Sequence, residues 1–157
     1  FMEEMRVQVN DVVQAVKDNT MPQIAERHHT FVEDIQPGLP DMWVDYYRLL
    51  QVLTNLVSNA YKYTPDGGII TLEAHRRSDR IHFRVADTGI GMSKADLARL
   101  GTKFWRAEDV YTRSQPGTGL GFAITRALVE QMGSSITAES EPGRGSAFSF
   151  SVAIAQG

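Results

Sequence analysis

The sequence contains no cysteine, so neither a disulfide framework nor a thiolate metal site is available to it. It also lacks an apolar run approaching the roughly 20 residues of a membrane-spanning helix, and its start, FMEEMR, lacks the apolar stretch of a signal peptide. Neither sign of charge is in large excess, because 16 Lys and Arg stand against 19 Asp and Glu, for a net charge of −3. This balance argues against a protein that binds nucleic acid mainly through its phosphates.

What is present is an ordinary globular composition. The 157 residues are 42% hydrophobic and 22% charged, which favours one domain with a real hydrophobic core. The absence of cysteine permits a reducing compartment. Because the chain begins at Phe1 rather than at a methionine, we expect it to be part of a longer protein.

Hydrophobic periodicity and turn signals predict an α+β domain. Apolar residues at helical spacing predict an amphipathic helix over residues 4–27, which Pro22 can interrupt. Asp45 is a plausible N-cap for a second helix that ends near Tyr63. A third helix is expected over 118–132, and strands over 30–35, 69–75, 80–86, 135–140 and 146–153. Only one crossover has the βαβ pattern, so we expect a mixed sheet with helices on one face.

The second predicted helix carries an unusual polar face. Arg48, Gln51, Asn55, Asn59 and Lys62 fall within an arc of about 80°, beside an apolar arc of about 100°. Such a face can simply point to water, but asparagine is a poor helix former and Glu or Lys would cost less there. A pair of amides one turn apart, followed by a lysine, suits a hard cation such as Mg²⁺ that also carries phosphate.

Two glycine motifs and a long irregular segment follow. Asp87-x-Gly89-x-Gly91 comes directly after a predicted strand, where a carboxylate can accept a hydrogen bond from an exocyclic amine; a tight turn capped by Asp87 is the alternative. The run from Gly117 through Thr118, Gly119 and Leu120 to Gly121 opens a helix, and accessible backbone N–H groups there can hold phosphate.

The segment 88–117 has no sustained period, which is typical of a functional loop or a lid. Within it, the aromatic rings of Phe104 and Trp105 could anchor a closed lid, and Arg106 could meet developing phosphate charge. An anchored loop with a solvated arginine is the other interpretation.

Taken in order, these motifs resemble the catalytic and ATP-binding domain of bacterial sensor histidine kinases. The motifs that carry the resemblance are Asn55-x-x-x-Asn59-Ala60-x-Lys62-Tyr63-Thr64-Pro65, Asp87-x-Gly89-x-Gly91, Phe104-Trp105-Arg106 and Gly117-Thr118-Gly119-Leu120-Gly121. The resemblance implies a Bergerat-type ATP-binding fold: a two-layer α/β sandwich with a mixed sheet of about five strands, three helices on one face and an ATP lid. It covers roughly residues 30–155. Residues 29–157 would form the catalytic domain, and residues 1–28 a helical segment continuing from a missing dimerisation and phosphoacceptor domain.

The resemblance also implies roles for individual residues. Asn59 would ligate Mg²⁺, with Asn55 and Lys62 near the phosphates of ATP. Tyr63 would pack near adenine and Asp87 would bond its amino group. The remaining implied nucleotide contacts are Gly89, Gly91, Phe104, Arg106, Gly117, Thr118, Gly119, Leu120, Gly121 and Ser146. Asn55, Lys62 and Arg106 would assist phosphoryl transfer.

The four histidines, His28, His29, His75 and His82, do not fit the acceptor pattern of the family, so a satisfied or solvated role is expected for each. We therefore expect the γ-phosphoryl group of ATP to pass to a histidine on a separate helical domain, with a response regulator as an indirect partner. The resemblance further implies a cytoplasmic domain, monomeric as this chain and homodimeric in the full-length protein, whether or not that protein is anchored in a membrane.

Three alternatives remain open at the level of sequence. One is a true ATPase of the same superfamily, although those enzymes place a glutamate at the position of Asn55 and an amide cannot act as a general base. The others are an anti-sigma-type serine kinase and a nucleotide-binding scaffold without catalysis.

Overall fold

The computed structural model describes residues 2–100 and 121–157. In chain order the elements are β1 (Glu4–Val7), α1 (Val9–Glu26), β2 (Thr30–Ile35), β3 (Met42–Asp45), α2 (Tyr46–Lys62), β4 (Ile69–Arg77), β5 (Arg80–Asp87), α3 (Lys94–Arg99), α5 (Gly121–Gln131), β6 (Thr137–Glu141) and β7 (Gly145–Ala153). None of these described helices combines the length and apolar character that a bilayer span requires.

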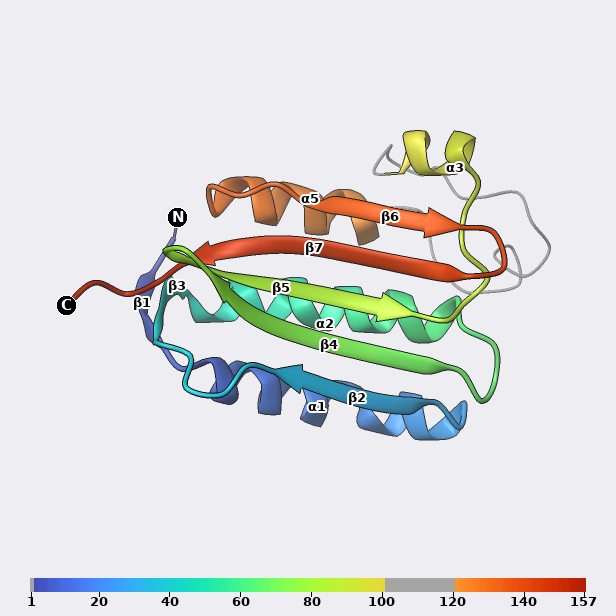
Figure 1. Ribbon diagram of the computed structural model, residues 1–157, viewed down its shortest axis with the longest axis horizontal. Coiled ribbons are helices and arrows are strands. Elements are labelled where there is room, and N and C mark those ends of the chain that lie inside the picture. The colour runs from blue at the N-terminus through green and yellow to red at the C-terminus, as the bar shows by residue number, and fades with distance from the viewer. Residues whose placement is uncertain (1, 101–120) are drawn as a thin grey trace.

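A five-stranded sheet with the strand order β2-β4-β5-β7-β6 forms one layer of the domain. Strands β2 and β4 pair in parallel, and the other neighbours pair antiparallel. Helices α1, α2 and α5 all lie behind the sheet in Figure 1, so they form the second layer. The predicted mixed sheet with helices on one face, and the α+β fold class, are confirmed.

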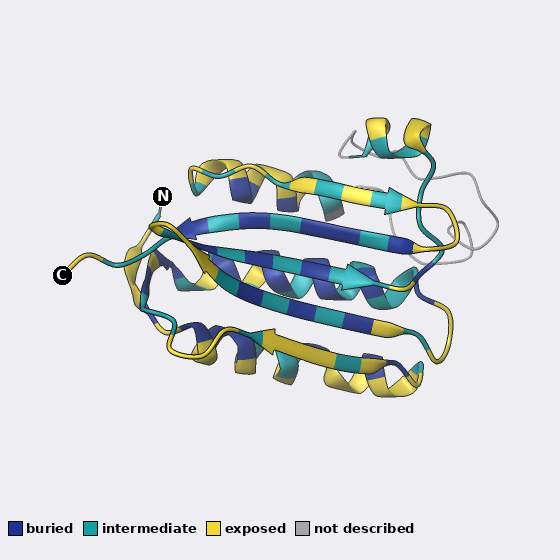
Figure 2. Ribbon diagram, in the orientation of Figure 1, coloured by how far each residue is buried: buried dark blue, intermediate teal, exposed yellow. Residues whose placement is uncertain are grey.

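The core lies between the sheet and the three helices. Along β4, β5 and β7 buried positions alternate with partly exposed ones, as Figure 2 shows by its banded strands. Ile81, Phe83 and Val85 of β5 face the helices and are at most 1% exposed, as their alternation in the sequence predicts. The opposite face of the sheet carries no helix among the described residues and is polar.

Two parts of the fold differ from the sequence prediction. The helix predicted over 4–27 begins only at Val9, because Glu4–Val7 form strand β1 instead. Strand β1 pairs with β3, a strand of four residues that the sequence prediction also missed. The register places Met5 of β1 opposite Val44 of β3. This pairing joins segments almost 40 residues apart, so no local pattern could reveal it.

The helix α3 lies inside the segment predicted to have no regular element. Its N-cap Ser93 accepts a hydrogen bond from the backbone N–H of Asp96 at 3.1 Å, which is the ordinary way a short helix begins.

Pro22 lies within α1 and does not end it. The buried valines of α1 belong to the same core as α2, and the continuation of residues 1–28 into another domain stays a prediction.

Candidate nucleotide-binding site

Helix α2 carries the amides that the sequence singled out. Asp45 caps it as predicted, because its Oδ1 accepts the backbone N–H of Arg48 at 3.1 Å. The apolar arc is buried against the sheet and α1, with Leu49, Val52, Leu53 and Leu56 at most 2% exposed. Asn55, Asn59 and Lys62 are partly exposed along the edge of this buried stripe. The polar face therefore does not point straight into solvent.

Helix α5 runs antiparallel to α2 and faces its polar edge. The Nδ2 group of Asn55 donates to Oγ1 of the buried Thr125 at 3.2 Å, and Nη1 of Arg48 donates to Oε1 of Gln131 at 3.1 Å. Because the two helices are antiparallel, the step from Asn55 to Asn59 along α2 corresponds to the step from Thr125 back to Gly121 along α5. Asn59 is therefore level with Gly121, the first residue of α5. Asn59 is thus at the level of a helix start, where backbone N–H groups favour anions.

Asp87 lies at the end of β5, at the same end of the domain as the last turn of α2 and the start of α5 (Figure 1). Its Oδ1 accepts the backbone N–H groups of Gly89 at 2.9 Å and of Ser146 at 3.3 Å. Burial raises the pKa of Asp87 to about 6, against the opposing effects of those two N–H groups and of the His29 imidazole. A buried carboxylate with unfavourable solvation is typical of a functional site.

The glycines of the Asp87 motif are required by close backbone packing. A Cβ at Gly89 would lie 2.4 Å from the carbonyl oxygen of Tyr63, so this turn touches the end of α2 directly. Gly91 has a φ of +69°, and a Cβ there would lie 1.9 Å from the carbonyl oxygen of Glu141. The backbone N–H of Ile90 also donates to Tyr63 O at 3.1 Å. The motif therefore joins α2, β5 and β6.

A chain of hydroxyl groups continues from Asp87 into the neighbouring strands. Ser146 lies directly opposite Asp87 in the register of β7, and its Oγ is 2.8 Å from Oγ of Ser140. The Ser140 hydroxyl also accepts the backbone N–H of Met92 at 2.8 Å and donates to Gly145 O at 3.0 Å. Ser140 was not among the predicted site residues. It lies on β6 directly opposite Ser146 of β7, and this pairing brings the two hydroxyl groups together.

Two further residues missed by the sequence prediction hold the C-terminal end of α2. Nη1 of Arg27 donates to the carbonyl oxygens of Tyr61 and Lys62 at 3.2 and 3.1 Å. Nε2 of the buried His29 lies 2.8 Å from Thr64 O and 3.2 Å from Pro65 O. A positive or donating group suits the last carbonyls of a helix, which have no partner within it. These contacts fix the segment that carries Lys62 and Tyr63.

The structure thus brings Asn55, Asn59, Lys62, Tyr63, Asp87, Gly89, Gly91 and Ser146 to one end of the domain, together with the start of α5 at Gly121. Six predicted residues lie outside the described part of the chain: Phe104, Arg106, Gly117, Thr118, Gly119 and Leu120. Their roles stay predictions. His75 and His82, by contrast, are paired with each other near the turn between β4 and β5, at the opposite end of these strands from Asp87.

Comparison with known proteins agrees with this arrangement. Residues 44–156 match the family described as "Histidine kinase-, DNA gyrase B-, and HSP90-like ATPase". The sensor histidine kinase GacS of Pseudomonas protegens is 44% identical over 112 residues, which are 69% of this chain and 12% of that protein. The chain spans only 12 to 21% of the first curated relatives that it matches.

Solved structures show the same fold. Full-length ShkA in complex with AMPPNP superposes with a TM-score of 0.88 at 29% identity, over 100% of this chain and 33% of that one. The catalytic domain of the histidine kinase ThkA superposes with a TM-score of 0.83 at 22% identity, over 98% of this chain and 97% of that one. The resemblance inferred from the motifs is confirmed, and the chain belongs to the histidine kinase-, DNA gyrase B- and HSP90-like ATPase family.

Proposed function

We propose that this domain binds Mg·ATP and donates the γ-phosphoryl group to a histidine on a separate helical domain of the same sensor kinase. The observation that carries the proposal is the position of the Asp87 carboxylate. The backbone N–H groups of Gly89 and Ser146 hold this carboxylate at the same end of the domain as the last turn of α2, the helix that carries Asn59 and Lys62. A fixed, buried acceptor suits the amino group of adenine, and the amides at the edge of α2 suit a phosphate-bound cation.

The residues of α2 fit the Mg²⁺ that the family implies. Asn59 supplies a neutral amide from the last turns of α2, and a neutral oxygen ligand is appropriate where phosphates supply the negative charge. When bound, Mg²⁺ would neutralise charge on the transferring phosphoryl group. Lys62 would offset phosphate charge from the end of α2, and the start of α5 would receive phosphate oxygens. Arg106 is proposed to add a positive charge from the lid.

Catalysis by this chain would consist of positioning and charge stabilisation. The neutral imidazole of the acceptor histidine would attack the γ-phosphorus, forming an N–P bond as the bond to the leaving ADP oxygen breaks. Asn55 supports transfer rather than hydrolysis, because its amide is bonded to Thr125 and cannot take a proton from water. A response regulator would then receive the phosphoryl group. The AMPPNP bound in the ShkA structure supports ATP as the nucleotide.

The test combines calorimetry with transfer. The chain is titrated with ATP in the presence of Mg²⁺ and is then incubated with ATP and a separately purified acceptor domain. We expect Mg²⁺-dependent binding, loss of that dependence in Asn59→Ala, and unchanged binding in Gln51→Ala, an exposed residue of the same helix. Proven ATP binding without transfer would count against the kinase assignment.

Three outcomes would favour the alternatives. Appreciable steady-state hydrolysis that disappears in Asn55→Ala would favour a true ATPase. Failure to bind ATP at millimolar concentration would leave a scaffold without catalysis. Transfer to a serine-bearing partner rather than to the acceptor histidine would favour the anti-sigma-type kinase.

A further inference from the structure

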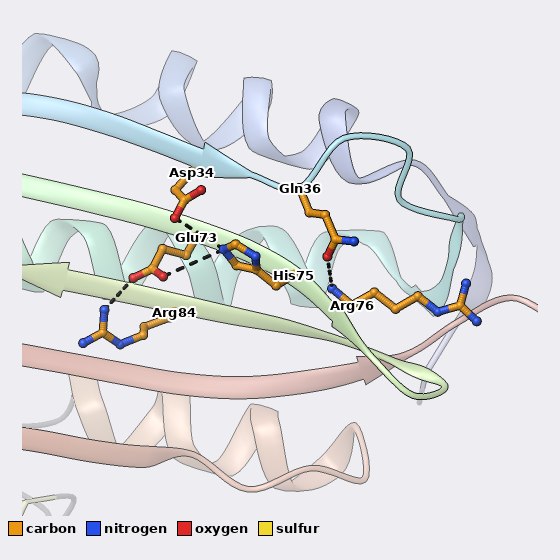
Figure 3. A network of polar contacts seen from close by, with 6 residues as sticks. All are labelled: Asp34, Gln36, Glu73, His75, Arg76 and Arg84. Atoms are coloured by element: carbon orange, nitrogen blue, oxygen red, sulfur yellow. Dashed lines mark hydrogen bonds and ion pairs between the residues drawn. The ribbon is translucent and has the colours of Figure 1, made fainter.

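The open face of the sheet carries a cluster of side chains that the nucleotide site does not use. Asp34 of β2 is the register partner of Glu73 of β4, and His75 follows two residues later on the same face of β4. Figure 3 shows the three side chains converging on this face, with both carboxylates directed toward the same nitrogen of the His75 ring. Since all three project from paired strands, their relative positions are set by the sheet ladder rather than by a loop.

The distances in this cluster are those of ligands around a common ion. His75 Nε2 lies 3.4 Å from Asp34 Oδ2 and 3.9 Å from Glu73 Oε1, and one ligand atom of each residue lies within 4.8 Å of the others. A charge-assisted N–H···O bond would be about 2.7–2.9 Å long. Tetrahedral bonds of about 2.0–2.1 Å to a zinc ion separate their ligand atoms by about 3.4 Å.

The surroundings orient the carboxylates. Nη1 of Arg84 on β5 pairs with Oε2 of Glu73, which leaves Oε1 directed toward His75. Such an outer hydrogen bond is how metal-binding carboxylates are commonly held. Two carboxylates and one guanidinium leave a net negative charge at the cluster. The Nε2 atom of His75 faces both carboxylates.

We propose that Asp34, Glu73 and His75 form a binding site for a divalent transition-metal ion of the Zn²⁺ type, with solvent completing the coordination. One imidazole nitrogen and two carboxylate oxygens are a suitable three-ligand set for such an ion, whereas Mg²⁺ prefers oxygen ligands in octahedral geometry.

This site is separate from the nucleotide site. Asp87 is paired with Ile70, which is buried against the helices, whereas the cluster lies on the other face of the sheet. His75 is also five residues further along β4 from Ile70, or about 17 Å at 3.3 Å per residue. A metal at the cluster would join the edge strand β2 to β4. It would therefore stabilise the folded chain without contacting the nucleotide.

The experiment uses the untagged chain without nucleotide, in buffer that contains excess Mg²⁺. Titration with ZnCl₂ in a calorimeter is expected to show one saturable site, which Mg²⁺ does not block. Thermal unfolding is expected to shift upward with Zn²⁺ in the wild-type chain. Bound Co²⁺ offers a second readout, because its visible absorption reports the coordination number.

The informative variants are His75→Ala and Asp34→Asn. Each is expected to weaken Zn²⁺ binding by about tenfold or more and to remove the thermal shift. The matched control is His28→Ala, because His28 is also exposed but faces a single carboxylate, that of Asp66 at 3.9 Å. Because the cluster is on the surface, the variants should unfold at the same temperature as wild type without metal. Equal Zn²⁺ affinity in wild type and His75→Ala would overturn the proposal, as would loss of binding in His28→Ala.

Discussion

The Nε2 atom of His29 lies 2.8 Å from the carbonyl oxygen of Thr64, two residues beyond the last residue of α2. A carbonyl oxygen can only accept, so Nε2 carries the proton of this bond. His29 is 8% exposed and its Nδ1 is buried without a hydrogen-bond partner among the described residues. The sequence alone predicts only a satisfied or solvated role for His29. In the structure, His29 holds the backbone at Thr64 and Pro65, which directly follows α2.

Replacing His29 should therefore weaken both the fold and the site. His29→Ala leaves the Thr64 and Pro65 carbonyls without this donor, which should lower the free energy of unfolding by about 1–3 kcal/mol. ATP affinity should fall because Lys62 and Tyr63 are less firmly positioned. His29→Gln, which keeps an N–H donor, should recover part of both losses. Urea unfolding and calorimetry measure the two effects.

His28→Ala is the control for this experiment. The His28 side chain is 79% exposed, so its removal should change unfolding by less than about 0.5 kcal/mol. If the two alanine variants unfold alike, the His29 contact does not stabilise the end of α2.

Asp87→Asn should stabilise the nucleotide-free domain while removing nucleotide binding. The pKa of Asp87 rises from 3.8 to about 6 in the folded state, so folded molecules bind the extra proton between these pH values. Stability from this group therefore falls as pH rises from about 4 to 6, by about 3 kcal/mol at 1.36 kcal/mol per unit. Asparagine keeps an oxygen for the Gly89 and Ser146 N–H groups. Unfolding at pH 8 and at pH 4 should show a stability gain only at the higher pH.

Nucleotide discrimination should depend on pH through the same carboxyl. Above a pH of about 6 the Asp87 carboxylate can accept from the amino group of adenine, and below it the protonated form increasingly cannot. The ratio of ATP affinity to ITP affinity should fall as pH decreases through 6, because ITP carries a carbonyl at that position. The ratio cancels the titration of the phosphates, which both nucleotides share. A ratio that is constant from pH 5 to pH 8 would exclude Asp87 as the base-recognition group.

Alanine substitutions at Gly91 and at Gly143 compare two sources of lost stability. One is the unfavourable positive φ that both positions share, and the other is the close backbone contact present only at Gly91. Both have positive φ, +69° and +76°, but an alanine Cβ would meet Glu141 O at 1.9 Å only at Gly91. Gly143→Ala should cost about 1–2 kcal/mol of conformational energy. Gly91→Ala should cost several kcal/mol, because two backbone segments must separate. Equal losses in denaturant unfolding would show that the contact with β6 is unimportant.

The sequence predicts the elements whose pattern is local. The cap at Asp45, the apolar stripe of α2 and the alternation of Ile81, Phe83 and Val85 each repeat with the period of one element, and the structure confirms them. Strands β1 and β3 escaped prediction because four residues are too few to show a period and their pairing is distant in sequence. The start of α1 was misplaced for the same reason.

The candidate site divides in the same way. The four sequence motifs, taken in their order along the chain, were sufficient to indicate a nucleotide-binding family, because together they resemble those of the ATP-binding domains of sensor histidine kinases. Only the tertiary structure determined which groups touch them. His29, Arg27, Ser140 and Thr125 act through contacts across 30 to 70 residues of chain, where hydrogen-bond geometry depends on how α1, α5 and β6 pack. The same holds for Asp34 beside His75, which the sheet register alone brings together.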